Sequence, residues 1–381
     1  MYIVLQDDPV LKKQLYPLTM LKPIWKLRIG ILTIEEKWRQ ISKLSVETKR
    51  TDKFPKADPS EYITINSSVL PDRNVWETIK SLSFGQELVD SEGVIIASFG
   101  NETLAQVLFE GKINSISRPW HISQLNATEI IRDFSLVTSG RKTNTIDDKG
   151  TIIYGDKIFI EKGATITASS LNSTTGPIYI GKNARLEEGS IVRGPFAACE
   201  SSTIKIGAKI RENNTIGPHC KVGGEMSNSV IQGYSNKSHD GFMGDSVIGE
   251  WCNLGADTNI SNLKNNYSLV RSWSYAEESM IDTGLQFSGL IMGDHSKCAI
   301  NTMFNTGTVV GTAANIFGAG FPPKFIPSFT WGGIDTLCTY EFEKALLTIQ
   351  KSMHRKRKQL NSVDIEFLRI AFDKDSKFRD K

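Results

Sequence analysis

The chain has 381 residues, 39% of them hydrophobic and 23% charged, and its formal net charge is only +3. A length above the ~100–200 residues of one domain predicts two domains. So small a net charge gives no sign of nucleic acid or a membrane surface as a partner. The five cysteines stand singly, which argues against a zinc site or a disulfide framework and favours a cytoplasmic location. We expect neither a signal peptide nor a membrane span, because no segment has the required apolar run.

Residues 1–140 have the pattern of an α/β domain. Short apolar segments predict strands at residues 2–5, 62–65 and 93–97. A helix is predicted from Pro23 to about Gln40, because apolar residues recur there at helical spacing. Further helix-like pieces lie at residues 79–82, 104–109 and 127–134.

Between about residues 146 and 333, apolar residues recur at every sixth position. This is neither a helical nor a simple strand period. The interval is unbroken in three runs: Ile204, Ile210, Ile216 and Val222; Ile248, Leu254 and Ile260; and Met292, Cys298, Phe304, Val310 and Ile316. Such hexads predict a parallel β-helix in which three short strands close each triangular coil.

Glycine often follows the inward residue of a hexad, as in Gly217, Gly255 and Gly311. We expect these glycines at corners that need a positive φ. Coils of hexapeptide repeats are left-handed, against the usual right-handed crossover. A β-sandwich is the alternative, but it predicts period-2 alternation, which these runs lack.

Residues 334–381 predict a helical tail, with one helix at about residues 340–359 and a second around 363–372. We expect it to pack on the end or flank of the β-helix. The run from His354 to Lys358 is interpreted as a solvated helix face whose charge suits a helix C-terminus. A nucleic-acid patch is the alternative.

The N-terminus carries a second pattern, Leu15-Tyr16-Pro17-Leu18-Thr19 followed by Lys22-Pro23. This resembles the start of the sugar-1-phosphate nucleotidyltransferases. The resemblance implies an α/β nucleotidyltransferase-like domain over residues 1–140, with Thr19 and Lys22 at a nucleotide or sugar phosphate. A structural turn and helix start is the alternative for both residues.

Two features of that family are missing. Residues 6–15 contain no glycine, whereas a phosphate cradle needs close backbone N–H groups, and Gln14 stands where the family has an arginine. Asn66-Ser67 stands where the family places the aspartate that holds Mg²⁺, although Asp7 or Asp72 could substitute. We therefore expect a reduced domain, with Mg²⁺ needed only if nucleotidyl transfer is retained and with its ligands undefined.

The block from Lys237 to Asn262 resembles the acetyltransferase half of the bifunctional N-acetylglucosamine-1-phosphate uridyltransferase/glucosamine-1-phosphate acetyltransferases. A lysine, then a histidine, then Gly244-Asp245, Ile248-Gly249 and Asn253-Leu254-Gly255-Ala256 keep that family's spacing. The resemblance implies a left-handed β-helix acyltransferase over residues 146–333. Phe242 and Leu263 replace family tyrosines near the sugar, so the substrate is expected to differ.

By this resemblance His239 is the general base, a role that suits an imidazole near neutral pH. Asn253 and Asn262 are expected to contact an amino sugar, with Lys237 near its phosphate. Small residues at Ala256, Gly318 and Ala319 are expected to line the groove of an acyl-CoA donor such as acetyl-CoA.

The inserted segment 265–286 leaves the hexad pattern and carries Arg271, Trp273 and Tyr275. In such acyltransferases an inserted loop reaches a neighbouring chain, so this one could close a site between subunits. The alternative is a loop whose aromatic side chains cover the wall of the β-helix.

We therefore predict an acyl-CoA-dependent N-acyltransferase acting on an amino sugar phosphate, with an attached sugar-1-phosphate nucleotidyltransferase-like domain. Two alternatives remain: a nucleotidyltransferase with a structural β-helix, and a non-catalytic protein that binds sugar nucleotides. A homotrimer is expected in each case.

Overall fold

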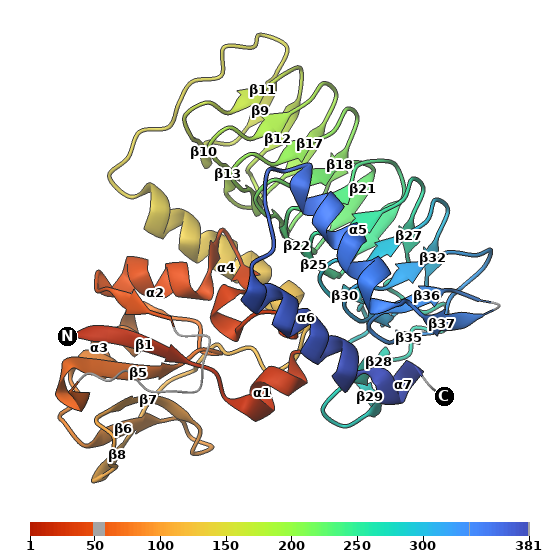
Figure 1. Ribbon diagram of the computed structural model, residues 1–381. Helices are drawn as coiled ribbons and strands as arrows, with labels where there is room; N and C mark the ends of the chain where they lie inside the picture. Colours follow the sequence, from red (N-terminus) through yellow and green to blue (C-terminus); the bar gives the residue numbers. More distant parts are fainter. Residues whose placement is uncertain (49–57, 335, 380–381) are drawn as a thin grey trace.

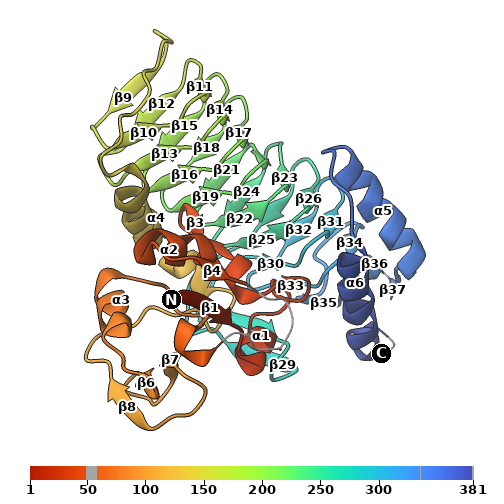
Figure 2. The same ribbon diagram turned by 60° about the vertical axis from the view of Figure 1, so that its left-hand side comes forward.

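The computed structural model describes residues 1–48, 58–334 and 336–379. An α/β domain at the N-terminus lies against a long prism of short strands, and C-terminal helices lie along the same prism (Figure 1). The view in Figure 2 shows the strands stacked in successive coils along the prism. Among the described residues, none of the helices combines the length and apolar character needed to cross a membrane.

The N-terminal domain contains a six-stranded sheet in the order β4-β1-β5-β7-β6-β8. Strand β1 is parallel to both β4 and β5, so the chain reverses its direction of winding at β1. The strands are β1 (Tyr2–Gln6), β4 (Val46–Glu47), β5 (Tyr62–Asn66), β6 (Gln86–Val89), β7 (Ile95–Phe99) and β8 (Ala105–Leu108). The helices are α1 (Pro9–Gln14), α2 (Ile34–Ser42), α3 (Arg73–Lys80) and α4 (His121–Thr138), with 3₁₀ turns η1 (Ile24–Lys26) and η2 (Pro59–Glu61).

Two of the predicted helices in this domain are wrong. The segment from Pro23 to Gln40 forms η1, then a hairpin of β2 (Arg28–Ile29) and β3 (Leu32–Thr33), and only then α2. Gly30 turns the hairpin with a φ of +76°, and Thr33 starts α2 in a capping box with Glu36. Residues 104–109 contain strand β8, which pairs with β6. In both cases tertiary pairing overrides an apolar spacing that resembles a helix.

Residues 152–332 form three parallel sheets, the walls of the prism. The first wall comprises β10 (Ile158–Ile160), β13 (Ile178–Ile180), β16 (Phe196–Ala198), β19 (Asn214–Ile216), β22 (Val230–Gly233), β25 (Val247–Glu250), β30 (Ile291–Met292), β33 (Val309–Val310) and β35 (Phe325–Ile326). The second comprises β11 (Thr165–Ile166), β14 (Arg185–Leu186), β17 (Thr203–Ile204), β20 (Lys221–Val222), β23 (Asn236–Lys237), β26 (Asn253–Leu254), β31 (Lys297–Cys298), β34 (Asn315–Ile316) and β36 (Thr330–Gly332), with β37 (Leu337–Thr339) added antiparallel. The third comprises β9 (Ile152–Tyr154), β12 (Ser170–Asn172), β15 (Ile191–Arg193), β18 (Lys209–Ile210), β21 (Glu225–Ser227), β24 (Phe242–Gly244), β27 (Asn259–Ile260) and β32 (Met303–Phe304).

The hexad residues fill the inside of the prism, as predicted. All twelve members of the three unbroken runs are buried in one apolar cluster. Each coil adds three such side chains to a continuous core, which is why a repeat this short holds a fold together. The predicted parallel β-helix is therefore confirmed.

The glycines after the inward residues serve a different purpose from the one predicted. A Cβ on Gly217 would lie 1.9 Å from the carbonyl oxygen of Gln232 on the next coil. A Cβ on Gly255 would likewise lie 2.4 Å from the carbonyl carbon of Ala299. The positive φ falls two residues later, on His219 (59°) and Asp257 (55°). The glycines are therefore required by the close approach of coils, and other residues turn the corner.

Both flanking regions pack on the outside of the prism. Val230, Val247, Ile291 and Val309 of the first wall share one apolar cluster with the core of the N-terminal domain. The tail forms α5 (Phe342–His354), α6 (Ser362–Lys374) and α7 (Ser376–Arg379). An apolar cluster joins α5 and α6 to the corner between the first and second walls, so the tail lies on the flank of the β-helix.

Candidate functional site

His239 lies at the corner between the second and third walls, after β23 and before β24. Ala256 lies on the same corner one coil further along, and Gly318 and Ala319 lie two coils beyond Ala256. Asn301 occupies this corner on the coil between Ala256 and Gly318, where its N–H donates to the Ala256 carbonyl at 2.8 Å. We call this corner the His239 edge. It brings the predicted base and the predicted acyl-CoA residues onto one line.

The side chains of the His239 edge are open to solvent. His239, Gly318 and Ala319 are exposed and Ala256 is half-buried. Gly318 has a φ of +123°, a conformation that favours glycine, and the nearest atom to a Cβ there is 3.6 Å away. A ligand lying along this edge therefore meets little side-chain bulk at its Gly318 end.

Lys237 does not lie where a phosphate contact requires it. Its side chain is buried inside the prism, and its Nζ donates to the carbonyl oxygens of Gly223 (3.3 Å), His239 (3.1 Å) and Asp240 (3.2 Å). Burial lowers the pKa of Lys237 to about 8. The hexad register contains the missed signal, because Ile231, Lys237 and Met243 are six residues apart and Lys237 is therefore an inward residue. Lys237 holds the backbone of the corner that carries His239.

The two predicted asparagines lie on different parts of the prism. Asn253 is exposed on β26 in the second wall, two residues after Trp251 and three residues before Ala256, and it pairs with Asn236. Asn262 follows β27 at the corner between the third and first walls, where its Nδ2 donates to Asp245 at 2.6 Å. Asp245 also accepts a bond from Asn228 at 2.5 Å. Within one chain Asn253 therefore lies on a wall that borders the His239 edge, whereas Asn262 lies on a different corner.

The inserted segment forms a hairpin of β28 (Arg271–Ser274) and β29 (Ser279–Asp282) that packs on its own chain. Trp273 stacks on Phe325 with ring centroids 4.2 Å apart. The Tyr275 hydroxyl lies 3.1 Å from a carboxylate oxygen of Asp375. Arg118 of the N-terminal domain contacts both carboxylate oxygens of Glu277, at 2.7 and 3.0 Å. Through these aromatic contacts and the Arg118–Glu277 ion pair, the hairpin joins the N-terminal domain, the first wall and the tail of the same chain.

The carboxyl ends of β1 and β5 meet at a pocket of about 510 Å³ in the N-terminal domain. Such an edge is the usual ligand site of an open α/β sheet. Asp7 at this edge already accepts bonds from the Ile24 N–H (3.1 Å to each oxygen) and the Ser67 hydroxyl (2.6 Å), and lies 3.5 Å from Lys12 Nζ. Burial raises the pKa of Asp7. Its carboxylate thus anchors the loop that follows.

Thr19 and Lys22, predicted at a phosphate, are both buried. The Thr19 hydroxyl donates to the Lys12 carbonyl at 2.7 Å. Lys22 Nζ lies 3.0 Å from Asp294 and 3.4 Å from Glu250, both on the β-helix. Burial lowers the pKa of Lys22, but the two carboxylates outweigh it and the net shift is upward. In this structure Lys22 joins the two domains and is closed to a nucleotide.

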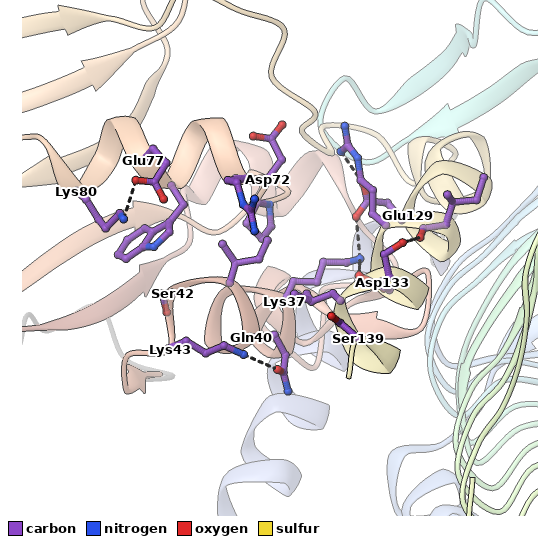
Figure 3. A pocket seen from close by; sticks show the side chains of 18 residues that line it. Lys37, Gln40, Ser42, Lys43, Asp72, Glu77, Lys80, Glu129, Asp133 and Ser139 are labelled. Carbon is purple, nitrogen blue, oxygen red and sulfur yellow. Dashed lines mark hydrogen bonds and ion pairs between the residues drawn. The ribbon is translucent and has the colours of Figure 1, made fainter. Parts of the chain in front are cut away.

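A larger groove of about 950 Å³ runs between α2, α3 and α4 (Figure 3). Lys37 lies in its floor, with Nζ 2.7 Å from Glu129 and 2.6 Å from Asp133, and all three side chains are buried. Asp133 also accepts the N–H groups of Ile31 and Leu32, and burial raises its pKa to about 6. This cluster fixes α4 to α2 and to the β2–β3 turn. The sequence does not predict it, because Lys37 is more than 90 positions away from both carboxylates.

Comparison with known proteins finds a family match for the N-terminal domain and relatives described as bifunctional proteins. Residues 3–142 match a family model described as sugar nucleotidyl transferase. The chain is 28% identical over 249 residues to the bifunctional protein GlmU of Methanocaldococcus jannaschii, which covers 63% of this chain and 52% of the relative. It is also 28% identical over 209 residues to a bifunctional sugar-1-phosphate nucleotidylyltransferase/acetyltransferase of Sulfurisphaera tokodaii, covering 55% of this chain and 46% of that protein.

These matches identify residues 3–142 as a sugar nucleotidyl transferase family domain. The chain is a homologue, at low identity, of the bifunctional GlmU proteins. It spans about half or less of the length of the first of these relatives. Among solved structures, the polysialic-acid-specific acetyltransferase NeuO covers 56% of this chain and 98% of its own, at 14% identity and a TM-score of 0.29.

Proposed function

We propose that the chain is an acyl-CoA-dependent N-acyltransferase acting on an amino sugar phosphate, with the chemistry on the His239 edge. The observation that carries this proposal is the alignment of His239, Ala256 and Gly318 on one open corner of the prism. Homology to bifunctional nucleotidylyltransferase/acetyltransferases supports it. A soluble homotrimer in the cytoplasm is part of the same proposal.

His239 acts as the general base in this account. An amine attacks the thioester carbonyl carbon only after its ammonium proton has left, and a neutral imidazole accepts that proton near pH 7. As the new C–N bond forms and the C–S bond breaks, the nitrogen loses a second proton to the departing sulfur, so the products are the amide and the free thiol of CoA. Asn253 contacts the sugar from β26, and Ala256, Gly318 and Ala319 leave room for the pantetheine arm.

Asn262 requires a second subunit in this proposal. Asn262 lies on a different corner from His239 of the same chain. In the proposed trimer the corner that carries Asn262 in one subunit meets the His239 edge of the next, so that Asn262 contacts the substrate held by a neighbouring His239. Lys237 positions the His239 corner and contacts no phosphate.

Nucleotidyl transfer by the N-terminal domain is a second candidate, favoured by the family match over residues 3–142. That reaction needs Mg²⁺ held by carboxylates beside the phosphates. The described residues do not fit this metal. Asp7 is bonded by protein groups, Asp72 caps α3 by accepting the Val75 N–H, and the described part of the chain holds no group of three or more His, Cys, Asp or Glu residues arranged to hold a metal ion. Nor does Lys22 face this pocket.

Mass spectrometry of reactions with a matrix of substrates separates these candidates. The purified chain is incubated with acyl-CoA donors and amino sugar phosphates, and separately with nucleoside triphosphates, sugar 1-phosphates and Mg²⁺. We expect an acylated amino sugar phosphate from the first set. If only the second set yields a product, a sugar nucleotide, the activity belongs to the N-terminal domain. Tight binding of sugar nucleotides without any product would favour a non-catalytic binding protein.

A further inference from the structure

A ladder of residues with positive φ runs along the corner between the first and second walls. The N–H of each member donates to a carbonyl on the preceding coil at 2.8–3.2 Å. The members, one per coil, are Asn183, Ser201, His219, Tyr234, Trp251, His295, Ala313 and Phe329. We call this corner the Trp251 edge. It lies across the second wall from the His239 edge.

Three successive members of the ladder form an aromatic stack. The ring centroids of His219 and Tyr234 are 4.8 Å apart, and those of Tyr234 and Trp251 are 4.2 Å apart, with interplanar angles of 21° and 7°. This spacing follows the ~4.8 Å repeat of neighbouring strands, so the backbone itself sets the rings at stacking distance. Any flat group placed on the next coil would continue the stack.

The stack ends with an open position at Ser201. The coil before the one that carries His219 has Ser201 at this position, and the coil before that has the exposed Asn183. Within the described residues no aromatic ring stacks on the face of His219 that is turned away from Tyr234. At the other end of the stack, Trp251 and His295 continue toward the tail, where α5 covers the edge. The Ser201 position is therefore a vacancy in an otherwise regular ladder.

Positive charge acts on His219, the last ring of the stack. Burial lowers the pKa of His219, and the charges of Lys356 and Lys358, which follow α5, lower it further. Burial, followed by the nearby Lys221 and Arg355, likewise lowers the pKa of Lys356. In the described part of the chain, none of the cations Lys221, Arg355, Lys356 and Lys358 forms an ion pair with a carboxylate. Glu200 is the one acidic residue whose charge raises the pKa of His219.

We propose that the Ser201 position of the Trp251 edge binds a nucleotide, whose base stacks on His219 and whose phosphates pair with Lys356 and Lys358. Every nucleobase has a π-face, and stacking on aromatic side chains is tolerant of base identity. Phosphate supplies the negatively charged partner that the lysines lack. The run from His354 to Lys358 thus has a ligand, and it is a single nucleotide rather than a nucleic acid. The nucleotide is either free or the nucleotide end of a larger molecule such as CoA.

Isothermal titration of the full chain with ADP, UDP and adenosine tests the proposal first. We expect both diphosphates to bind, adenosine to bind at least tenfold more weakly, and rising salt to weaken the diphosphates most. Failure of both diphosphates to bind at millimolar concentration would overturn the proposal. So would equal binding of adenosine and ADP.

Two tryptophan variants of the ladder give a matched pair. Ser201→Trp fills the vacancy with a ring of the chain itself and is expected to weaken ADP binding by at least roughly tenfold. Asn183→Trp places the same ring one coil further away, where it leaves the vacancy open and adds a second stacking face. Its ADP affinity should be unchanged or higher. Trp251 has a φ of 62°, so tryptophan is compatible with these positions. Equal ADP affinities of the two variants would contradict the proposal.

The phosphate contact and the source of the nucleotide need separate variants. The double variant Lys356→Ala/Lys358→Ala should lose ADP binding, whereas Lys351→Ala on the exposed face of α5 should keep it. His239→Ala should bind ADP normally, which separates this site from the proposed catalytic one. If Ser201→Trp raises the KM for acyl-CoA, the ligand is the donor's nucleotide. If it weakens ADP binding and leaves acyl transfer unchanged, the ligand is a free nucleotide.

Discussion

Lys22 Nζ lies 3.0 Å from Asp294 Oδ1, and this contact joins the loop before η1 to the corner between β30 and β31. Both side chains are buried. A sequence motif that suggests phosphate binding therefore holds two domains together.

Lys22→Met should destabilise the chain by about 3 kcal/mol, because it leaves the buried carboxylate of Asp294 without its cation. Adding Asp294→Leu should recover much of the loss, since neither charge then remains. Lys344→Met breaks an exposed pair with Glu341 and should change stability by less than about 0.5 kcal/mol. Urea unfolding monitored by circular dichroism measures all three. If Lys22→Met lowers the free energy of unfolding no more than Lys344→Met does, the Lys22–Asp294 pair does not stabilise the contact between the domains.

Asp133 should make the folded state less stable as pH rises between about 4 and 6. Its pKa is raised from an ordinary 3.8 to about 6, so in this window the unfolded chain releases the proton before the folded chain does. Ionisation of Asp133 thus costs the fold about 3 kcal/mol at most by pH 7. The Asp133→Asn variant should lack this contribution, so its stability should fall less over the window. Parallel pH dependence of the two proteins would show that the pKa of Asp133 is not raised.

Gly217→Ala should destabilise the β-helix by about 3 kcal/mol, because the added Cβ meets the Gln232 carbonyl of the next coil. Gly207→Ala is the control. No atom lies within 4 Å of a Cβ at Gly207, and only its φ of +68° opposes the change, at about 1 kcal/mol. Thermal unfolding separates the two explanations of hexad glycines. A larger loss of stability in Gly207→Ala than in Gly217→Ala would instead show that a positive φ, and not the close approach of coils, is the main reason for these glycines.

Tyr275→Phe should loosen the hairpin from the tail, because the Tyr275 hydroxyl is bonded to Asp375 in a buried setting. We expect a loss of about 1–2 kcal/mol and faster amide exchange in β28, β29 and the end of α6. Tyr267→Phe, at an exposed position of the same insertion, should leave exchange unchanged. Hydrogen exchange read by mass spectrometry decides, and identical exchange in the two variants would argue against the intrachain contact.

The prism could be predicted from the sequence because its rule is local. An inward side chain every six residues is the condition for three-walled coils, and Ile204, Ile248 and Met292 each start a run that the structure buries. The reason for the glycines could not be predicted in the same way. The Gln232 carbonyl that excludes a Cβ at Gly217 belongs to another coil, and its position depends on how the coils stack.

The site was less predictable because its residues depend on partners distant in sequence. Lys22 looks like a free cation until Asp294 is placed beside it, and Lys37 looks like a surface residue of α2 until Asp133 covers it. Lys237 is different, since its hexad register already indicated an inward side chain. A family motif implied a ligand there, whereas the repeat implied a structural role, and the structure follows the repeat.

The central claim is that the His239 edge performs acyl transfer, and thiol release from acetyl-CoA tests it most directly. With glucosamine 1-phosphate as acceptor, or the best acceptor from the substrate matrix, the wild-type chain should release CoA. His239→Ala should release it at least 100-fold more slowly while unfolding at the same temperature. Equal rates for the two proteins, or no acceptor-dependent thiol release by the wild type, would contradict the account.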